Sequence, residues 1–549
     1  SKWFTHDYTL LLIQNRIIMK ILNITFLLFF IGAFITGCYD DKGSYAYSDI
    51  NQIEIEKFLY SGQAFTVGDT IRVNPNLTFS KDPSDTLTLN YEWRFAGKTR
   101  KDWNQKNFFW IVDTIARGNL EMRITDTKNG MVYLRNIAIS LSSEFDAFGW
   151  AVLADKDNHS SLSFIKEREV KDEQKNTIFD NVVYQNIYET RNNGELLGQS
   201  PLKLHMHFCQ DKSSTIGQVM VIEGSSPYMV DLNGKTLKKE ITINQAFANQ
   251  TLPADFKPVN AMFMRWCDLI ENYDGKIYSR IKGTDQLFHS SAFLQTPLQF
   301  EGKVLEQCHL ILAKYMKSAC AIAHDKKNNR LLLIMDASYG SAAGAGEVKI
   351  CPGKPNTGSV EGWVPLDNMG DNKVIHIGYF TPKGSGQKVG IFMILQDKNG
   401  KYWTQEFVLK RQYDTSSYYL EECERNPIDL TSILKENSII YALPYQVASE
   451  FVLISSGADI YLYDRNSPND KIKLFYTCEG TVTCIEAERF YHRHAGVGTD
   501  NGKVVILNME KAKNLETKKE KVIWDTPTNI NFGKIIDIRF KTQYGNDWN

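Results

Sequence analysis

The sequence predicts an all-β protein in which a small β-sandwich is followed by a β-propeller. Short segments of alternating apolar and polar residues recur along most of the 549-residue chain, and this period is typical of strands with one buried face. Turn signals of the Asn-Gly and Asp-Gly type separate many of these segments, as they do in hairpins. Aromatic residues, which favour strands, make up 12% of the chain.

The length of the chain predicts more than one domain, because 549 residues exceed what one ordinary core holds. Composition and strand pattern divide it into four parts. Residues 1–37 are upstream residues and a signal peptide, residues 38–49 a tether, residues 50–143 the sandwich and residues 144–549 the propeller.

The first part ends in a secretory signal. An apolar run over residues 21–34 follows Met19-Lys20 and precedes Ile35-Thr36-Gly37-Cys38, which is the order of a signal peptide. Because a cysteine follows the small residues, the pattern resembles a bacterial lipobox. The resemblance implies cleavage before Cys38, a diacylglycerol on its sulfur and an acyl chain on its new amine. Residues 1–18 precede Met19, and the fold prediction excludes them.

The alternative is a transmembrane helix that ends at a chance cysteine. A span needs about 20 apolar residues, whereas the run before Cys38 is shorter and polar sequence follows it. The next segment, Tyr39-Asp40-Asp41-Lys42-Gly43, resembles the surface-export signal of lipoproteins from Bacteroidota. A solvated linker has the same charge pattern, and charge alone does not separate the two.

Alternating segments after the tether predict the sandwich. One strand places Tyr91, Trp93 and Phe95 on a single face, where they would form the core. Asn129-Gly130 is a two-residue turn signal between two further strands. The predicted strands cover residues 53–56, 70–73, 89–95, 120–126 and 133–141.

Two features of this region resemble a known family. The Tyr91-x-Trp93-x-Phe95 strand, with a later strand that ends in Thr125-Asp126, resembles the PKD-like (Ig-like) sandwich. The surrounding sequence is similar to the PKD-like lipoproteins of Bacteroidota. Their typical opening corresponds here to residues 38–43, Tyr45, Tyr47 and residues 50–53, and their second domain to residues 148–153, 366–370 and 376–379.

From residue 144 onward, short strands and tight turns continue to the end of the chain. A radial repeat protects the strand edges of so long an all-β region, so we predict a β-propeller. At roughly 50–60 residues per blade, six to eight blades fit, and we expect seven. The alternative is two or three further sandwiches in a row. Turn signals stand at Asn193-Gly194, Asn233-Gly234, Asp274-Gly275, Asn399-Gly400 and Asn501-Gly502.

Charge and cysteine content exclude several classes of function. The net charge is −1 without a long basic stripe, so nucleic-acid binding has no electrostatic support. The chain has nine cysteines but no Cys-x-x-Cys pair, which argues against zinc ribbons and thioredoxin-like sites. We expect most of the cysteines to be buried as small apolar residues. One or two long-range disulfides are compatible with an oxidising compartment.

Motifs for catalysis or metal binding are absent or incomplete. His205-x-His207 and His492-x-His494 each offer two imidazoles, but two ligands do not make a zinc site. Asp155-x-Asp157-Asn158 is a turn between strands rather than a calcium loop, because the later EF-hand ligands are missing. No Gly-x-Ser-x-Gly elbow occurs, and paired carboxylates can be recognised only in the fold. We therefore expect neither enzymatic activity, nor a metal, nor a cofactor.

Three aromatic residues are candidates for ligand binding. Trp266, Tyr339 and Trp363 stand in or beside predicted loops, where binding residues commonly lie and where exposed rings can stack on a ligand. The alternative is that these rings fill the interfaces between blades.

The family resemblance implies a function at the cell surface. It implies an outer-membrane lipoprotein, facing the cell exterior, that serves a SusC/SusD-like nutrient importer as an accessory binding subunit. The ligand would be an oligosaccharide or a peptide, and the aromatic content and near-zero net charge favour a neutral one. The alternatives are a secreted propeller hydrolase with catalytic carboxylates, and a purely structural subunit or adhesin.

Overall fold

A computed structural model describes most of the chain. The described residues are Lys20 and residues 50–81, 88–210, 215–282, 291–311, 320–336, 343–382, 388–412, 417–444, 450–488 and 493–542. Strands dominate them, as predicted, and the α-helices are the short α2 (Ile187–Arg191) and α3 (Lys518–Lys521). Within these ranges, no helix has the length and apolar character needed to cross a membrane.

The chain divides into two compact units. Among the described residues, the first comprises residues 50–58, 75–81, 88–91 and 123–135, and the second comprises the described parts of residues 59–74, 92–122 and 136–549. In the first unit, β1 (Ile53–Ile55) pairs antiparallel with β4 (Leu77–Phe79). The Tyr133 hydroxyl donates a hydrogen bond to the Asn51 carbonyl at 2.8 Å, which fixes the start of this strand pair.

The predicted sandwich strands are present. One sheet has the order β2-β8-β7-β5, and β3 pairs with β6. The Asn129-Gly130 signal lies between β7 and β8, where Gly130 has a φ of +72° and its amide donates to the Asp126 carbonyl at 2.8 Å. The connection is longer than two residues. The strands are β2 (Gln63–Thr66), β3 (Thr70–Val73), β5 (Leu89–Phe95), β6 (Phe108–Ile111), β7 (Ala116–Asp126) and β8 (Val132–Ser142).

Some residues of the sandwich belong to the second unit. Their core is a cluster of aromatic side chains. Trp93 is fully buried and Phe95 nearly so, as the sequence predicts, whereas Tyr91 is half-buried. The Trp93 and Phe108 rings lie 4.8 Å apart, and the Phe95 and Trp110 rings 5.3 Å apart. The Trp93 indole N–H donates to the Gln105 carbonyl at 3.0 Å, so the largest apolar side chain also satisfies its polar atom.

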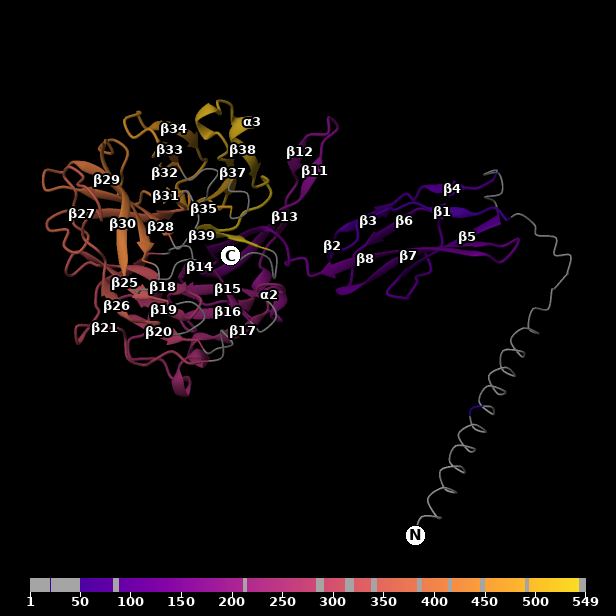
Figure 1. The fold of residues 1–549 in the computed structure, drawn as a ribbon, viewed down its shortest axis with the longest axis horizontal. Coiled ribbons are helices and arrows are strands. Elements are labelled where there is room, and N and C mark those ends of the chain that lie inside the picture. The colour runs from indigo at the N-terminus through magenta and orange to yellow at the C-terminus, as the bar shows by residue number, and fades with distance from the viewer. Residues whose placement is uncertain are drawn as a thin grey trace, which may run out of the picture. The chain divides into compact units, whose positions relative to one another are not determined.

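Seven antiparallel sheets of three or four strands follow in the described part of residues 149–541. Figure 1 shows these sheets side by side around a common centre. In chain order the sheets contain β9 (Gly149–Lys156), β10 (His159–Lys166), β13 (Val182–Tyr184) and β39 (Lys534–Lys541); β14 (Pro201–Gln210), β15 (Thr215–Glu223), β16 (Met229–Asn233) and β17 (Lys239–Thr242); β18 (Pro258–Phe263), β19 (Cys267–Asn272) and β20 (Ile277–Ile281); β23 (Cys308–Ile311), β24 (Cys320–Asp325), β25 (Arg330–Met335) and β26 (Val348–Ile350); β27 (Lys373–Phe380), β28 (Lys388–Gln396), β29 (Tyr402–Arg411) and β30 (Tyr418–Ile428); β31 (Ile440–Ala442), β32 (Phe451–Ser456), β33 (Asp459–Asp464) and β34 (Lys473–Thr477); and β35 (Val482–Ala487), β36 (His494–Thr499), β37 (Val504–Asn508) and β38 (Val522–Asp525).

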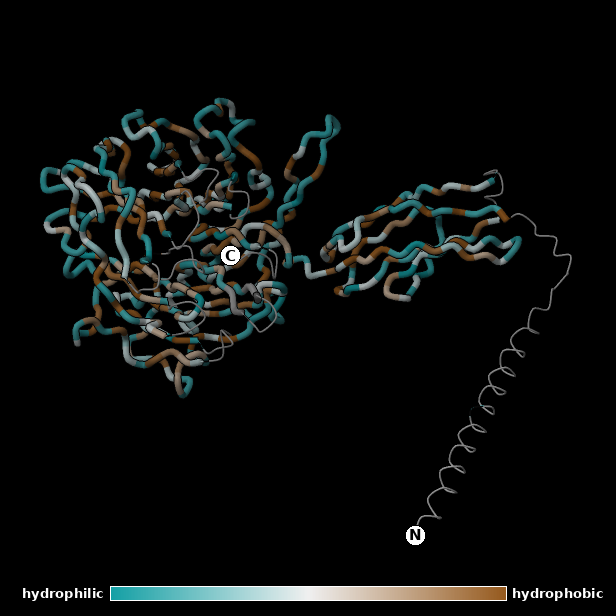
Figure 2. The backbone as a smooth tube through the Cα atoms, viewed as in Figure 1, coloured by the Kyte–Doolittle hydropathy of each residue, from teal (hydrophilic) through white to brown (hydrophobic). Residues whose placement is uncertain are grey.

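Two short hairpins lie outside these sheets. They are β11 (Glu169–Lys171) with β12 (Thr177–Phe179), and β21 (Gln299–Phe300) with β22 (Lys303–Val304). Figure 2 shows apolar stretches that recur along the strands, with hydrophilic residues at many outer turns. This distribution follows from burying the faces of the sheets while their connections stay in water.

Apolar clusters join each sheet to the next, so the order in the chain is also the order in space. One cluster contains residues of the first and second sheets, and a second cluster joins the second sheet to the third. A larger cluster joins the third, fourth and fifth sheets. Two more join the fifth sheet to the sixth and the sixth to the seventh. The last one brings Val152 of the first sheet against Ile506 of the seventh. The series therefore returns to its beginning, which makes the fold propeller-like.

The first sheet combines strands from both ends of this region. Strand β39 pairs antiparallel with β9, and Phe540 stands opposite Trp150. The Trp150 indole is fully buried and meets the Phe540 ring edge-on at 5.0 Å. Burial of so large a side chain contributes several kcal/mol, so this joint is a major stabilising contact.

Most of the predicted turns connect strands of one sheet. Asn233-Gly234, Asp274-Gly275, Asn399-Gly400 and Asn501-Gly502 each lie between two consecutive strands. Asp157 and Asn158 have φ values of +53° and +63° and link β9 to β10, which confirms the predicted turn. Asn193-Gly194 differs, because it follows α2 rather than joining two strands.

The cysteines with described side chains are free thiols. Six of them are buried, and Cys423 is partly exposed. Burial raises the pKa of Cys320 to about 12, so its thiol stays protonated and behaves as a small apolar group. The prediction of buried cysteines is confirmed for these residues, while Cys38 and the side chain of Cys209 lie outside the described part of the chain.

Candidate functional site

The edge strands nearest the common centre carry a group of polar side chains. These strands are β39, β14, β18, β23, β27, β31 and β35, and each stands at one edge of its sheet. Strands β14 and β35 both contact β39, and β18 contacts both β14 and β23. We call the following residues the inner-strand network: Lys203 and His205 on β14, Asn260 on β18, Glu271 on β19, His309 on β23, Glu486 on β35, and Asp537 and Arg539 on β39.

Arg539 connects three of these strands. Its guanidinium pairs with Glu486, lies 3.3 Å from the Asp537 carboxylate and donates to the Leu204 carbonyl at 3.0 Å. The Leu204 amide in turn donates to Asp537 at 2.9 Å. Burial raises the pKa of Glu486, although Arg539 opposes the shift. The arrangement satisfies buried charges with fixed partners, as a low-dielectric site requires.

Glu271 forms a second centre in the network. Its carboxylate accepts hydrogen bonds from the His309 ring at 3.0 Å, the Leu310 amide at 2.9 Å and the Asn260 side chain at 3.1 Å. Burial acts to raise the pKa of Glu271, but these donors outweigh burial and hold the pKa below its usual value. Glu271 is therefore ionised at neutral pH and fixes the orientation of its neighbours.

Lys203 is the exception in this network. Its side chain is half-buried, and none of the ion pairs and hydrogen bonds among the described residues involves its ammonium group. Burial and the nearby Arg539 lower the pKa of Lys203, against the opposing effect of Asp537 and Glu271. The Lys203 ammonium could therefore accept a further carboxylate at ion-pair distance.

Two further polar atoms in this region have unused hydrogen-bonding capacity. In the described part of the molecule, the buried Asn260 Oδ1 and the His376 Nε2 on β27 have no hydrogen-bond partner. Burial lowers the pKa of His376 to about 4, so its ring is neutral at pH 7. Such atoms are rare inside proteins, and a polar group that reached them would gain a hydrogen bond.

The two aromatic candidates that the structure describes, Trp266 and Trp363, are not among the residues of this network. Trp266 is 5% exposed, with the Arg265 guanidinium 5.8 Å from its ring, and its burial fits the packing role given above as the alternative. Trp363 is partly exposed. Its indole N–H donates to the Gly353 carbonyl at 2.9 Å, and its ring lies 6.3 Å from the Phe407 ring. Tyr339 and Cys38 fall outside the described residues.

A buried ionic cluster lies beneath Trp266. Asp268 and Arg280 are fully buried and stand opposite each other on β19 and β20. The Asp268 carboxylate lies 2.7 Å from the Arg280 guanidinium and 3.0 Å from the Lys282 ammonium. Asp336 adds a second carboxylate, which accepts from the amides of residues 265–267 at 2.7–3.1 Å. We call Asp268, Arg280, Lys282 and Asp336 the ionic cluster and assign it a structural role.

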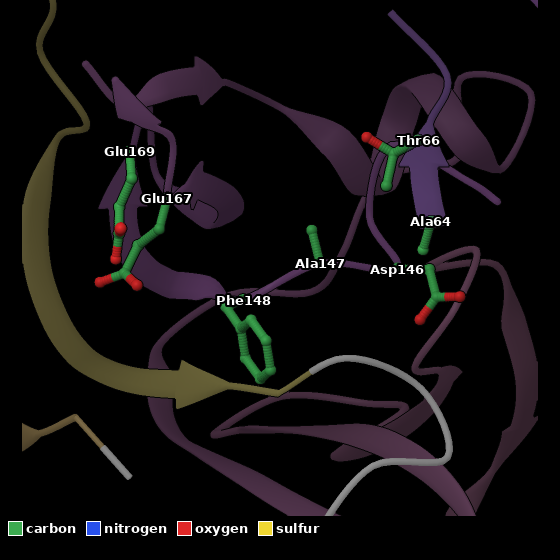
Figure 3. Close-up of a pocket in the computed structure, with 7 residues that line it drawn as sticks. All are labelled: Ala64, Thr66, Asp146, Ala147, Phe148, Glu167 and Glu169. Atoms are coloured by element: carbon green, nitrogen blue, oxygen red, sulfur yellow. The ribbon is translucent and has the colours of Figure 1, made fainter. Parts of the chain in front are cut away.

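A separate pocket of about 260 Å³ lies in the second unit. Figure 3 shows Glu167 and Glu169 on one side of it, Asp146 and Thr66 on the other, and Phe148 between them. Burial and the neighbouring Glu488 raise the pKa of Glu167 to about 8, while the Trp150 indole N–H, 3.2 Å away, opposes the shift. At neutral pH Glu167 is therefore a proton donor among other carboxylates.

Glu223 is a buried carboxyl group outside both sites. It ends β15 with no exposed surface, and neither of its oxygens has a hydrogen-bond partner among the described residues. Burial is the main cause that raises the pKa of Glu223 to about 7.

The two histidine pairs have structural contacts. His207 pairs with the buried Asp231 at 2.8 Å and stacks on Phe263 at 4.1 Å. His205 accepts from the Ala261 amide at 3.3 Å. His494 meets Phe179 edge-on at 5.2 Å, and His492 lies outside the described residues. Within those residues, no group of three or more His, Cys, Asp or Glu is placed to hold a metal ion.

Sequence reasoning missed most of the inner-strand network. The alternation Lys203-x-His205 and Asp537-x-Arg539 was a usable signal, because polar residues on alternate positions of a strand share a face. What the sequence could not provide was the meeting of β14 with β39, since these strands stand near opposite ends of the propeller-like region.

Comparisons with known proteins found a family model that matches the N-terminal part of the chain. Residues 38–201 match the model of the PKD-like family. A "Quinonprotein alcohol dehydrogenase-like protein" from Bacteroides thetaiotaomicron is 13% identical with a TM-score of 0.37, and the match covers 89% of this chain and 99% of that one. The apo structure of AztD from Citrobacter koseri is 10% identical with a TM-score of 0.33, and the match covers 70% and 84% of the two chains. No curated protein sequence matches.

Proposed function

We propose that this chain is a lipoprotein anchored in the outer membrane through Cys38 and exposed at the cell surface. In this role it serves a SusC/SusD-like importer as an accessory subunit that binds an oligosaccharide or peptide without turnover. The lipobox pattern supports the anchor. The match of residues 38–201 to the PKD-like family is compatible with this assignment, which otherwise rests on the sequence resemblance.

We further propose that the seven sheets are the blades of a seven-bladed propeller. The order of the sheets, the apolar clusters between successive sheets and the pairing of β39 with β9 support this architecture. It explains why the inner strands come together, because each blade contributes its first strand to the axis.

The observation that supports binding most directly is the unused polar capacity of the inner strands. Lys203 makes no ion pair at contact distance among the described residues, although Asp537 and Glu271 act on its pKa from further away, and Asn260 and His376 each have a buried atom without a hydrogen bond. Natural proteins seldom leave such groups unsatisfied, and sites that hold ligands combine a few of them on a rigid scaffold.

The binding proposal is tested with purified full-length protein in detergent. We expect at least one member of a glycan and peptide array to bind, with no release of sugars or amino termini over hours. An Asn260→Ala variant should weaken this binding, whereas replacement of the exposed Asn176 by Ala should not. Retention of the importer pair without any ligand binding would instead favour a structural subunit.

The anchor makes a separate prediction. A Cys38→Ala variant is expected to lose incorporation of labelled palmitate completely and to leave the membrane fraction, because the sulfur and the new amine of Cys38 are the acylated atoms. The matched control is Cys423→Ala, which changes a partly exposed cysteine within the fold. Equal labelling of the Cys38 variant and the control would disprove the anchor.

The pocket gives the hydrolase alternative one specific observation. A carboxyl that keeps its proton at neutral pH, beside a second carboxylate, is the arrangement that glycoside hydrolysis uses, and Glu167 and Glu169 line the same pocket. If the chain is a hydrolase, glycan cleavage should be detectable and should vanish in Glu167→Gln. Cleavage that persists in this variant would exclude the pocket as its site.

A further inference from the structure

We propose that the inner-strand network binds the carboxylate group of its ligand, with the Lys203 ammonium as the partner of that carboxylate. The inference rests on the proposed binding function and narrows it to a chemical class: acidic oligosaccharides or acidic peptides. Both sources share the carboxylate that the site recognises.

The charge pairing of the network carries this inference. Arg539 pairs with Glu486 and lies 3.3 Å from Asp537, and Glu271 is held by His309 at 3.0 Å. Against these fixed pairs, the Lys203 ammonium has no carboxylate within ion-pair distance in the described part of the chain. Asp537, Glu271 and Glu486 act on the ammonium only from beyond that distance, and a carboxylate supplied by a ligand would give it a direct, charge-assisted contact.

The position of Lys203 makes such a contact accessible. The residue lies near the start of β14, beside the 37% exposed Leu202, and its own side chain reaches solvent in part. Protein covers the rest of the side chain, and this burial lowers its pKa. A carboxylate can therefore reach the ammonium from solvent and exchange weak hydration for a charge-assisted hydrogen bond.

Two unsatisfied atoms on other inner strands, β18 and β27, indicate the rest of the ligand. Asn260 Oδ1 accepts and His376 Nε2 belongs to a neutral ring, so they suit hydroxyl or amide groups rather than a second charge. The ligand expected from this set is a chain with one carboxylate among neutral polar groups. The net charge of −1 for the whole chain favoured a neutral ligand, but it does not describe the local charge at Lys203.

The test compares probes that differ only in charge. Trigalacturonate and its fully methyl-esterified form test the glycan source, and triglutamate and triglutamine test the peptide source. Binding to the full-length protein in detergent is measured by calorimetry. We expect the acidic member of one pair to bind about 10- to 100-fold more tightly than its neutral counterpart, which is the range of a charge-assisted hydrogen bond.

Variants at Lys203 then connect this preference to the site. Lys203→Gln should remove the difference between the two members of the pair and leave the neutral probe unchanged, while Lys203→Arg should retain part of it. Lys238→Gln, at an exposed position of the same sheet, is the matched control. A further measurement uses the unmutated chain with its lysines labelled by carbon-13 methylation. The pKa of Lys203, followed by NMR, should rise when the acidic probe is added.

The outcomes separate this inference from the proposed function. Equal binding of acidic and neutral probes, or an unchanged preference in Lys203→Gln, would overturn the carboxylate assignment while ligand binding stands. Binding of none of the four probes, in a protein that does bind another member of the array, would also overturn it. Binding of nothing at all would overturn both.

Discussion

Replacement of Asp268 by asparagine is expected to lower the free energy of unfolding by about 3–5 kcal/mol. The change keeps the shape of the side chain but removes the charge that pairs with Arg280 at 2.7 Å and with Lys282 at 3.0 Å. Both cations are almost completely buried, so the loss of the carboxylate that they share leaves two desolvated positive charges with less compensation. Chemical unfolding of the full-length chain, followed by tryptophan fluorescence, measures the loss.

The control for this experiment is an exposed ion pair of the same chemistry. Arg168 pairs with Asp180 on the surface, where about half of each side chain is exposed. Such pairs contribute about 0–1 kcal/mol, so Asp180→Asn should change stability little. If the two variants lost similar stability, burial would not be the cause of the effect and the structural role of the ionic cluster would be refuted.

The second large effect concerns pH. The folded protein raises the pKa of Glu223 from 4.5 to about 7, so the folded state binds this proton more tightly than the unfolded state. The associated stability is fully present below pH 4.5 and is lost as the pH rises through 7. A shift of this size corresponds to about 3 kcal/mol. We therefore expect the melting temperature to fall between pH 5 and pH 8.

Glu223→Gln isolates this contribution, because glutamine resembles the protonated acid. The variant should match the unmutated protein at pH 5, exceed its stability by about 3 kcal/mol at pH 8 and show a flatter pH profile. Glu173→Gln, at an exposed position, should leave the profile unchanged. A Glu223→Gln profile as steep as that of the unmutated protein would show that the carboxyl is already satisfied in the fold.

Glu167 contributes to the same pH dependence. Its pKa is raised to about 8, so its share of the stability is lost over a wider interval, from pH 4.5 to 8. A double variant with glutamine at residues 167 and 223 should therefore be flatter than either single variant. Additive effects are expected, because no described contact joins the two side chains.

Local patterns predicted the strands well, and the reason is physical. A strand with one buried face alternates in polarity wherever it lies, so the Tyr91-x-Trp93-x-Phe95 segment could be assigned without knowing its partner. The Asp157-Asn158 turn was equally predictable, because both residues tolerate positive φ. These features depend on neighbours in sequence and need no information from distant parts of the chain.

Register was harder to predict than turn position. A strict two-residue loop at Asp274-Gly275 would place Asp268 opposite Ile281, whereas the observed register places it opposite Arg280. A slip of one residue moves every side chain to a different partner. The turn signal was therefore correct in location but could not reveal the buried pair of Asp268 and Arg280.

The inner-strand network was beyond prediction for a different reason. Lys203, Glu271 and Arg539 belong to strands that meet only when successive sheets have packed side by side and the last strand has joined the first sheet. Their spacing along the chain carries no information about this meeting. The aromatic candidates were chosen because loops often bind ligands, and Trp266 shows how a large ring can instead be needed for packing.

The pairing of β39 with β9 has a consequence for how each molecule is made. During synthesis, the edge of β9 remains open until the ribosome has produced the strand that contains Phe540. Open edges of this kind attract chaperones, proteases and other chains. A molecule truncated anywhere before that strand would keep the open edge, and cells could remove it on that basis. Only a chain that has been synthesised through β39 can therefore cover the edge of β9.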